Sequence, residues 1–228
     1  MVASPAFSLR GRSREGSPAF GLRGRSREGS PAFSLKMNMN APLPVSAQLK
    51  EIEECAQNKE DALDGWDPFV AAAEVGDVAK VTEMLDSRMV DVNRVDSEGW
   101  SALIAAAAEG HLAVVNRLLV EPTVDVNLKN KANETALMRA ALSGHGDVTT
   151  ALLASEGVDV NAVNTAGKSA LIIAAGIGHE TIAIALLVAE GIDIGLADQE
   201  GKTALMHAME RGHEGVATLI DTVLMGDE

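Results

Sequence analysis

The sequence has no tyrosine, two tryptophans and four phenylalanines, so only 3% of its 228 residues are aromatic. Its one cysteine, Cys55, excludes an intrachain disulfide framework and a zinc site made of several cysteines. No basic region followed by an apolar run opens the sequence, so it carries no signal-peptide pattern. These absences predict a cytoplasmic protein, with the nucleus as the alternative, whose core consists of closely packed helices rich in Ala, Leu, Ile and Val.

A long uncharged apolar run is also missing. The most apolar stretch, residues 167–191, is interrupted by Gly176 and Gly178 and then by His179 and Glu180. A membrane-spanning helix needs roughly 20 predominantly apolar residues, and a charge near the bilayer centre is costly. We therefore predict two short helices in this stretch, separated by a glycine break, and no membrane span.

Charge is distributed unevenly along the chain. Residues 1–37 contain seven basic and two acidic residues, a net charge of +5, which leaves −19 for the remainder of a chain whose formal net charge is −14. A surface that binds nucleic acid is normally basic. The acidic remainder therefore predicts no nucleic-acid binding outside the basic segment.

The basic segment repeats a unit of thirteen residues. SPAFSLRGRSREG (4–16) is followed by SPAFGLRGRSREG (17–29) and by the partial copy SPAFSLK (30–36). Segments rich in Ser, Gly, Pro and Arg bury too little apolar surface to offset the entropy lost on ordering the chain. We therefore predict a disordered tail over residues 1–45.

Four interpretations of this tail stay open. It is an inert extension, or an extension that does not belong to the protein because Met37 or Met39 is the true start, or a regulatory tail, or a segment that associates with nucleic acid or a membrane. Ser13 and Ser26 each follow Arg-Gly-Arg, which resembles a phosphorylation site for basophilic kinases. Phosphorylation adds about −2 charge and would weaken the attraction of the tail to acidic surfaces.

From residue 65 a different repeat begins, with a step of 34 residues. Its helix-start positions are Asp67, Ser101, Thr135, Ser169 and Thr203, and its helix-end positions are Gly76, Gly110, Gly144, Gly178 and Gly212. An Asp, Ser or Thr oxygen accepts a hydrogen bond from a free backbone N–H at a helix start, and Gly tolerates the left-handed conformation at a helix end. Five units at one spacing indicate a repeat architecture.

Each unit continues with a second helix and a turn. The second helices carry apolar pairs such as Leu118 and Leu119, and we expect Pro122, Gly157 and Gly191 to end them. The turns contain the Asx residues Asp96, Asn130, Asn164 and Asp198. Because no unit can bury its apolar face alone, neighbouring units must complete the core.

These features resemble the ankyrin repeat. DVNAVNTAGKSALIIAAGIGH (159–179) and DQEGKTALMHAMERGHEGVATLI (198–220) are similar to the family's frame, Asp-x-x-Gly-x-Thr-Pro-Leu-His-x-Ala-Ala-x-x-Gly-His. The resemblance covers residues 65–224 and implies an all-α fold, a solenoid of helix-turn-helix units with short β-hairpin-like turns. The chain departs from the family in its step of 34, where 33 is usual, and in its Pro, which becomes Ala in four units.

A second departure concerns the His of the family's Thr-Pro-Leu-His. The corresponding positions hold Val70, Ile104, Met138, Ile172 and Met206. In the family this His ties the turn of one repeat to the next by hydrogen bonds. We therefore expect apolar packing in its place, and a less rigid stack.

The resemblance also implies a domain organisation. After the tail (1–45) we expect a helical N-terminal cap over residues 46–64 and an ankyrin repeat domain over residues 65–228. The expected repeats are 65–94, 95–128, 129–162, 163–196 and 197–228.

The pattern contains no constellation that predicts chemistry. Four histidines recur with the step of 34, namely His111, His145, His179 and His213. In stacked repeats they would lie about a repeat width apart, too far to share one ion at zinc–nitrogen distances of about 2.0–2.1 Å. His207 has no partner of its own in the pattern. We predict no enzyme activity, no catalytic residues, and no cofactor or metal.

What remains is a surface. The resemblance implies that the turns and first helices line a concave face that binds other proteins. The family's variable positions fall on Trp66, Glu74, Ser97, Glu98, Trp100, Glu109, Lys131, Glu134, Lys168, Glu200, Lys202 and Arg211. Trp66 and Trp100 occupy equivalent positions, and either they anchor a partner, ringed by acidic residues, or each covers its own turn.

The sequence thus predicts a monomeric, non-catalytic scaffold or interaction module with an unidentified protein partner. The alternative function is a targeting or inhibitory subunit of a kinase or phosphatase complex, which the repeats alone do not separate from a scaffold.

Overall fold

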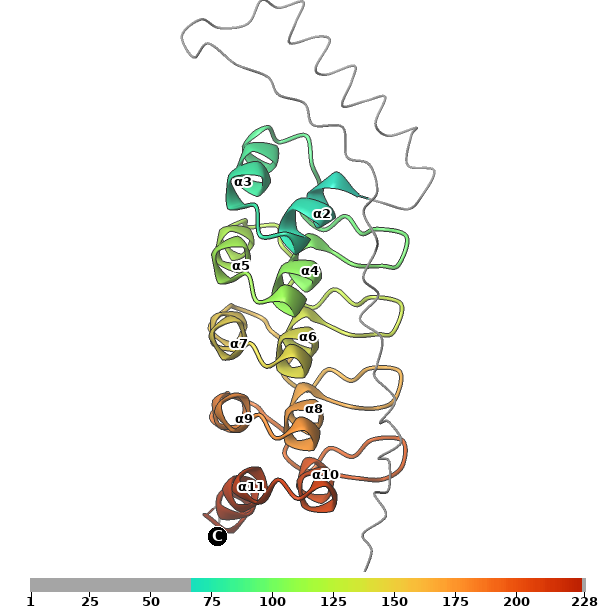
Figure 1. The fold of residues 1–228 in the computed structure, drawn as a ribbon, viewed down its shortest axis with the longest axis vertical. Coiled ribbons are helices and arrows are strands. Elements are labelled where there is room, and N and C mark those ends of the chain that lie inside the picture. The colour runs from blue at the N-terminus through green and yellow to red at the C-terminus, as the bar shows by residue number, and fades with distance from the viewer. Residues whose placement is uncertain (1–66, 227–228) are drawn as a thin grey trace, which may run out of the picture. The chain divides into compact units, whose positions relative to one another are not determined.

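The computed structural model describes residues 67–226, and within them ten α-helices follow one another along the chain (Figure 1). The helices are α2 (Pro68–Glu74), α3 (Val78–Asp86), α4 (Ala102–Glu109), α5 (Leu112–Leu119), α6 (Ala136–Ser143), α7 (Gly146–Leu153), α8 (Ala170–Ile177), α9 (Glu180–Leu187), α10 (Ala204–Arg211) and α11 (Glu214–Gly226). The predicted tail with Ser13 and Ser26, the predicted cap at 46–64 and Trp66 lie outside the described residues.

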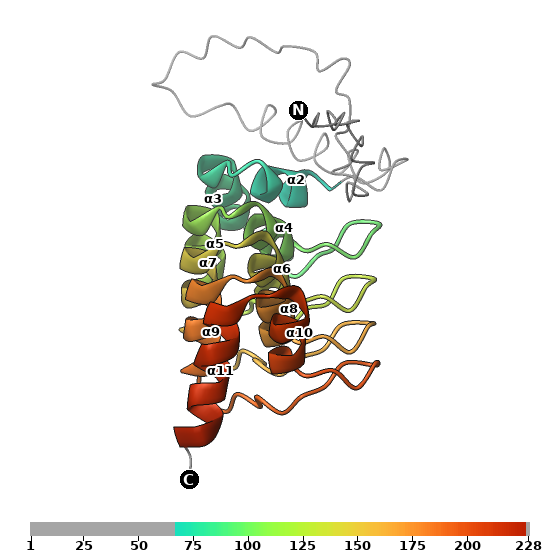
Figure 2. The same ribbon diagram turned by 60° about the horizontal axis from the view of Figure 1, so that its bottom comes forward.

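The helices pair into antiparallel hairpins that stack in single file. The first helices of the pairs (α2, α4, α6, α8, α10) form one column, the second helices (α3, α5, α7, α9, α11) form another, and loops project beside the first column (Figures 1 and 2). The predicted all-α solenoid is confirmed. Residues 167–191 contain α8 and α9, as predicted, and no helix in the described region is long and apolar enough to cross a membrane.

Each first helix begins where the sequence predicts, and all but α2, whose C-cap is Val75, also end at the predicted glycine. The side chain of Ser101 accepts a hydrogen bond from the N–H of Ile104 at 3.2 Å, and the other four predicted caps accept equivalent bonds. Gly110 ends α4 in the left-handed conformation with φ +79°, where a side chain would be strained. These local signals set the length of α4, α6, α8 and α10, which have eight residues each, so these first helices present the same shape to their neighbours.

The core lies between successive pairs. Small residues such as Ala106 and Ala107 are fully buried in the first helices, which pack against the first helices before and after them. Larger residues such as Leu118, Leu152 and Leu186 are fully buried in the second helices. The small side chains allow the first helices to approach closely, and the leucines fill the remaining space between the pairs.

The recurring histidines lock each pair onto the one before it. A Cβ atom on Gly110 would lie 2.5 Å from Nδ1 of His145, so the ring lies directly against the glycine. The same contact joins Gly76 to His111, Gly144 to His179 and Gly178 to His213. Nε2 of His145 also lies 3.1 Å from the carbonyl oxygen of Ala108. Glycine is therefore needed at these helix ends for two reasons, its φ angle and the approach of the next ring.

The asparagine of each DVN motif forms a second tie between neighbouring repeats. Nδ2 of Asn161 donates to the carbonyl oxygen of Gly191 at 2.7 Å, and its Oδ1 accepts from the N–H of Asp193 at 2.8 Å. Asn93 and Asn127 make the equivalent pair of bonds. In the fourth repeat this position is Gly195, which has no side chain with which to continue the ladder.

Two details differ from the sequence-based expectation. The second helices end at Leu119, Leu153 and Leu187, before the Pro and Gly residues predicted to end them, because those residues belong to the turn that follows. At the family's His position, Ile104 and Ile172 are buried as expected, whereas Met206 is 51% exposed.

Candidate functional site

The loops beside the first helices are built in the same way four times. We call them the fingers: residues 95–101, 129–135, 163–169 and 197–203. In the first, Oδ1 of Asp96 accepts from the N–H groups of Glu98 and Trp100, both at 2.8 Å, and the N–H of Asp96 donates to the carbonyl of Trp100 at 2.9 Å. The other three Asx residues make the same set of bonds.

Backbone hydrogen bonds join each finger to the next. The N–H of Lys131 donates to the carbonyl of Glu98 at 3.3 Å, and the N–H of Thr165 donates to the carbonyl of Ala132 at 3.0 Å. The N–H of Gln199 continues the series to the carbonyl of Ala166 at 3.2 Å. Figure 2 shows the fingers following one another beside the first helices. We call the fingers together with the exposed residues of the first helices the finger-side surface.

Trp100 joins two repeats on this surface. Its ring is half-buried and packs against the hydrophobic core, and Cζ of Arg139 lies 4.8 Å from the ring centroid. The guanidinium of Arg139 also contacts the carboxylate of Glu134 at 3.4 Å. A cation over a Trp face is attracted by the ring quadrupole. Trp100 therefore contacts the next repeat as well as its own turn, while its predicted partner Trp66 lies outside the described residues.

The charged residues Glu98 and Lys131 of the first two fingers are mostly exposed. Glu98 and Lys131 form an ion pair at 3.7 Å, and both side chains are about two-thirds exposed, 65% and 67% respectively. Exposed pairs of this kind contribute little to stability. Ser97, beside Glu98, is exposed, as are Glu74 and Glu109 on the first helices.

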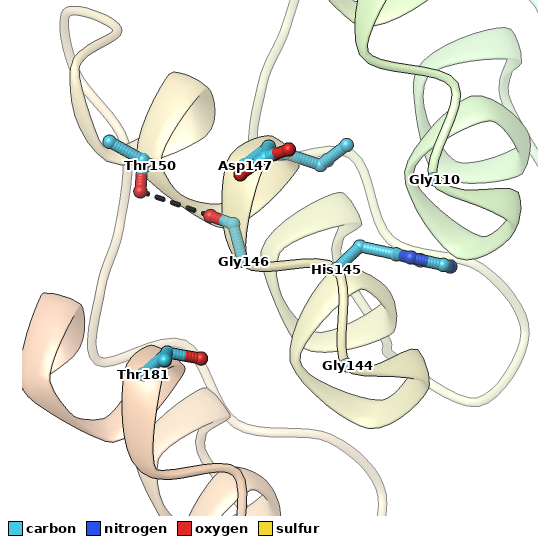
Figure 3. Close-up of a pocket in the computed structure, with 8 residues that line it drawn as sticks. Gly110, Gly144, His145, Gly146, Asp147, Thr150 and Thr181 are labelled. Carbon is cyan, nitrogen blue, oxygen red and sulfur yellow. Dashed lines mark hydrogen bonds between the residues drawn. The ribbon is translucent and has the colours of Figure 1, made fainter.

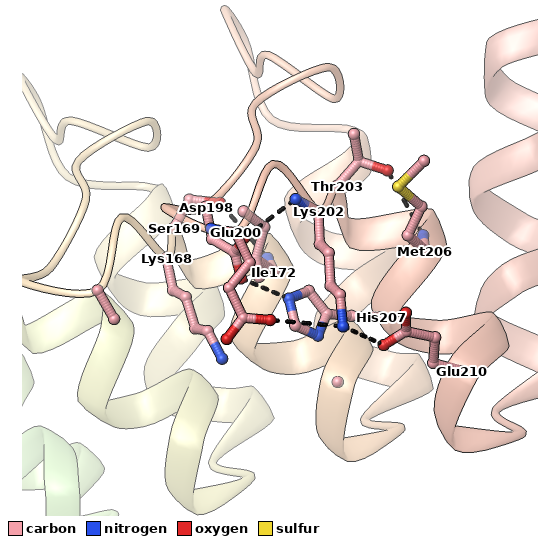
Figure 4. Close-up of polar contacts among 12 residues, drawn as sticks. Lys168, Ser169, Ile172, Asp198, Glu200, Lys202, Thr203, Met206, His207 and Glu210 are labelled. Carbon is pink, nitrogen blue, oxygen red and sulfur yellow. Dashed lines mark hydrogen bonds and ion pairs between the residues drawn. The ribbon is translucent and has the colours of Figure 1, made fainter.

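Lys202 is held much more firmly. Its ammonium lies 2.8 Å from a carboxylate oxygen of Glu210 and 3.4 Å from one of Glu200 (Figure 4). The hydrogen bond with Glu210 raises the pKa of Lys202, and the same bond lowers the pKa of Glu210. Arg211 follows Glu210 at the end of α10, and its Nη1 donates to the carbonyl of Gly176 at 2.7 Å. This bond ties the fifth repeat to the fourth.

The expectation that His207 lacks a partner is wrong. Its Nε2 lies 2.7 Å from Oδ2 of Asp198, and both residues are buried (Figure 4). Burial acts to raise the pKa of Asp198, but the hydrogen bonds from His207 and from the N–H groups of Lys202 and Glu200 outweigh it and hold this pKa below its usual range. The signal in the sequence is slight, because His207 occupies a position that is Ala, Arg or Ile in the other repeats.

Trp100, Glu134, Lys168 and Lys202 occupy equivalent positions in the four fingers, which we call the finger-base positions. Lys168 differs from the other three. It is half-buried, yet among the contacts of residues 67–226 its ammonium forms no ion pair. In Figure 4 no dashed line reaches the end of its side chain, whereas the ammonium of Lys202 is joined to two carboxylates.

A separate hollow lies where the linkers of neighbouring pairs approach one another. Its lining includes His145, Gly146, Asp147, Thr150 and Thr181 (Figure 3). The hydroxyl of Thr150 is already bonded to the carbonyl of Gly146 at 3.0 Å. The described residues contain no group of three or more His, Cys, Asp or Glu side chains that could hold a metal ion. The finger-side surface is therefore the stronger candidate.

Comparison with known proteins agrees with this architecture. The family model described as ankyrin repeats in three copies matches residues 45–130, 69–164 and 137–225. A search of the curated proteins gives no match. The overlapping family matches cover most of the sequence and all five helix pairs, so this chain belongs to the ankyrin repeat family.

Proposed function

We propose that this protein is a non-catalytic interaction module or scaffold that binds a partner protein on its finger-side surface. One observation carries the proposal. The residues that build the stack recur from repeat to repeat, whereas the finger-base position changes from Trp100 to Glu134, Lys168 and Lys202. Residues that support the fold are the same from repeat to repeat. Residues that differ between repeats give the surface a particular chemistry.

The family supports the general role. Ankyrin repeats support protein–protein interaction in general, and ankyrin repeat domains are generally non-catalytic. The hydrogen bonds within and between the fingers hold the surface in one shape before a partner arrives. A preformed surface loses less conformational entropy on binding, so more of the contact energy appears as affinity.

Within this surface we propose Trp66 and Trp100 as the anchor. Trp is enriched among residues that dominate binding energy. The exposed carboxylates of Glu74, Glu98 and Glu109 lie on the same finger-side elements and would favour a basic segment of the partner at this end.

The test replaces both anchors, Trp66→Ala and Trp100→Ala, and measures the affinity for a partner isolated with the wild-type chain. We expect a loss of at least about 2 kcal/mol, typical of a binding hot spot. Circular dichroism must show an unchanged helical content, because Trp100 also contacts Arg139. Val188→Ala, an exposed apolar truncation on the second-helix side, is the matched control. A loss as small as that of the control, with the fold intact, contradicts the proposed anchor.

A further inference from the structure

We infer that the last three repeats receive an acidic segment of the partner protein, with one of its carboxylates bound between Lys168 and Arg211. The inference deepens the proposed function and rests on it. It names the partner chemistry at the end of the finger-side surface away from the tryptophans.

The distribution of charge is the first argument. Residues 67–226 contain ten Lys and Arg and 23 Asp and Glu, a net charge of −13. The last three fingers with α6, α8 and α10 nevertheless carry six cations against four carboxylates, a net charge of +2, which leaves −15 for the remaining described residues. In a strongly acidic protein, this local excess of positive charge attracts an acidic partner to one part of one surface.

The repeat register is the second argument. Lys202 in the fifth repeat is neutralised by Glu200 and Glu210. Lys168 is its equivalent in the fourth repeat, 34 residues earlier, and there the two positions that supply the carboxylates hold Ala166 and Gly176. The fourth repeat thus has a lysine at the same position as the fifth, but it lacks both of the carboxylates that neutralise Lys202.

The surroundings of Gly176 give the third argument. Nη1 of Arg211 binds the Gly176 carbonyl at 2.7 Å, and it would lie 3.4 Å from a Cβ atom placed on Gly176. A partner carboxylate placed over Gly176 would therefore lie beside the Arg211 guanidinium. Gly176 is the position equivalent to Glu210, whose carboxylate contacts Lys202 in the fifth repeat. Nearby first-helix positions are apolar, with Leu142 38% exposed and Ile177 half-buried. The partner segment should carry an apolar residue close to its acidic one.

The test selects binders from a random peptide display library against the full chain and then measures the affinity of the synthetic selected peptides. We expect enrichment of Asp and Glu next to apolar residues. Lys168→Glu should weaken these peptides by about tenfold or more, as for a close charge pair. Ala166→Glu should weaken them too, because it supplies in the fourth repeat the carboxylate that Glu200 supplies in the fifth. Lys80→Glu on α3, with the same change in charge on the second-helix side, should leave the affinity within about twofold of the wild type.

The outcomes separate this inference from the proposed function. Selected peptides without excess acid, whose binding is lost in the double tryptophan variant, overturn the inference and leave the proposed function standing. Selected peptides unaffected by any finger-side substitution, or no selected peptides, count against both. A single-stranded RNA oligonucleotide that binds in a Lys168-dependent way, while acidic peptides do not, also overturns the inference.

Discussion

The asparagine ladder allows one tie between repeats to be removed without disturbing the core. Asn161→Ala deletes the bond from Nδ2 to the carbonyl of Gly191 and the bond from the N–H of Asp193 to Oδ1, at 2.7 and 2.8 Å. A net hydrogen bond contributes about 0.5–1.5 kcal/mol, and these two are exposed, so we expect a loss of about 1–2 kcal/mol in the free energy of unfolding.

The loss should be local, because in stacked repeats each unit contacts only its neighbours. The tie joins the third and fourth repeats, so α8 to α11 should separate from the stack more often, while α4 and α5 are unaffected. A loss of about 1–2 kcal/mol corresponds to amide hydrogen exchange about 5–30-fold faster in α11. Hydrogen exchange followed by mass spectrometry, together with urea unfolding followed by circular dichroism, gives both quantities.

The chain offers a matched control. Gly195 is the equivalent position in the fourth repeat, and Gly195→Asn introduces the same side chain there. The position 34 residues after Gly191 belongs to helix α11, so the next repeat does not offer the turn that Asn161 binds. We expect this variant to change stability by no more than about 0.5 kcal/mol, as for most surface substitutions. Equal effects of the two substitutions, or unchanged exchange in α11 of Asn161→Ala, would refute the reasoning.

Four further substitutions test the other contacts that hold the helices and the stack. Gly212→Ala should cost about 1–2 kcal/mol from its φ of +74° alone, whereas Gly110→Ala should cost more, because its methyl group also meets the histidine ring of the next repeat; thermal unfolding compares the two. Asp198→Asn should lose about 1.5–3 kcal/mol at neutral pH, as for a hydrogen bond to a charged group. The folded-state pKa of Asp198 is lowered, so its contribution to stability is complete above the unfolded pKa and is lost as pH falls through the folded pKa. Urea unfolding as a function of pH should therefore show the free energies of unfolding of the variant and the wild type converging in acid. Ser169→Ala removes a helix cap and should cost about 1 kcal/mol in the same urea assay, and a cost near zero would show that the cap is dispensable.

The repeat architecture could be predicted from the sequence because its signals are local. A helix start such as Ser169, or a helix end such as Gly178, depends only on nearby backbone groups, and a spacing of 34 residues multiplies the signal five times. The same spacing placed the finger-base residues, including Lys168, at equivalent positions.

The contacts between repeats could not be predicted in this way. The bond from Asn161 to Gly191 and the stacking of Arg139 on Trp100 depend on how far one repeat is rotated and shifted against the next. The spacing within one repeat does not determine that rotation. The Asp198 pair with His207 was missed for another reason, because it occurs in a single repeat and therefore leaves no periodic signal.

The ties between repeats make the protein modular in length. Each internal unit of 34 residues carries a histidine ring that packs against the helix-end glycine of the preceding repeat. It also carries an asparagine side chain that hydrogen-bonds to the backbone of the following repeat. Removing residues 129–162 would bring Asn127 to the partners that Asn161 has now and would bring His179 to Gly110. The histidine and asparagine contacts between neighbouring repeats would then form again in the shortened stack. Evolution or design can therefore shorten or lengthen this stack in whole units of 34 residues. Gly195 sets the limit of the asparagine ties, because it has no side-chain amide with which to bind a following repeat.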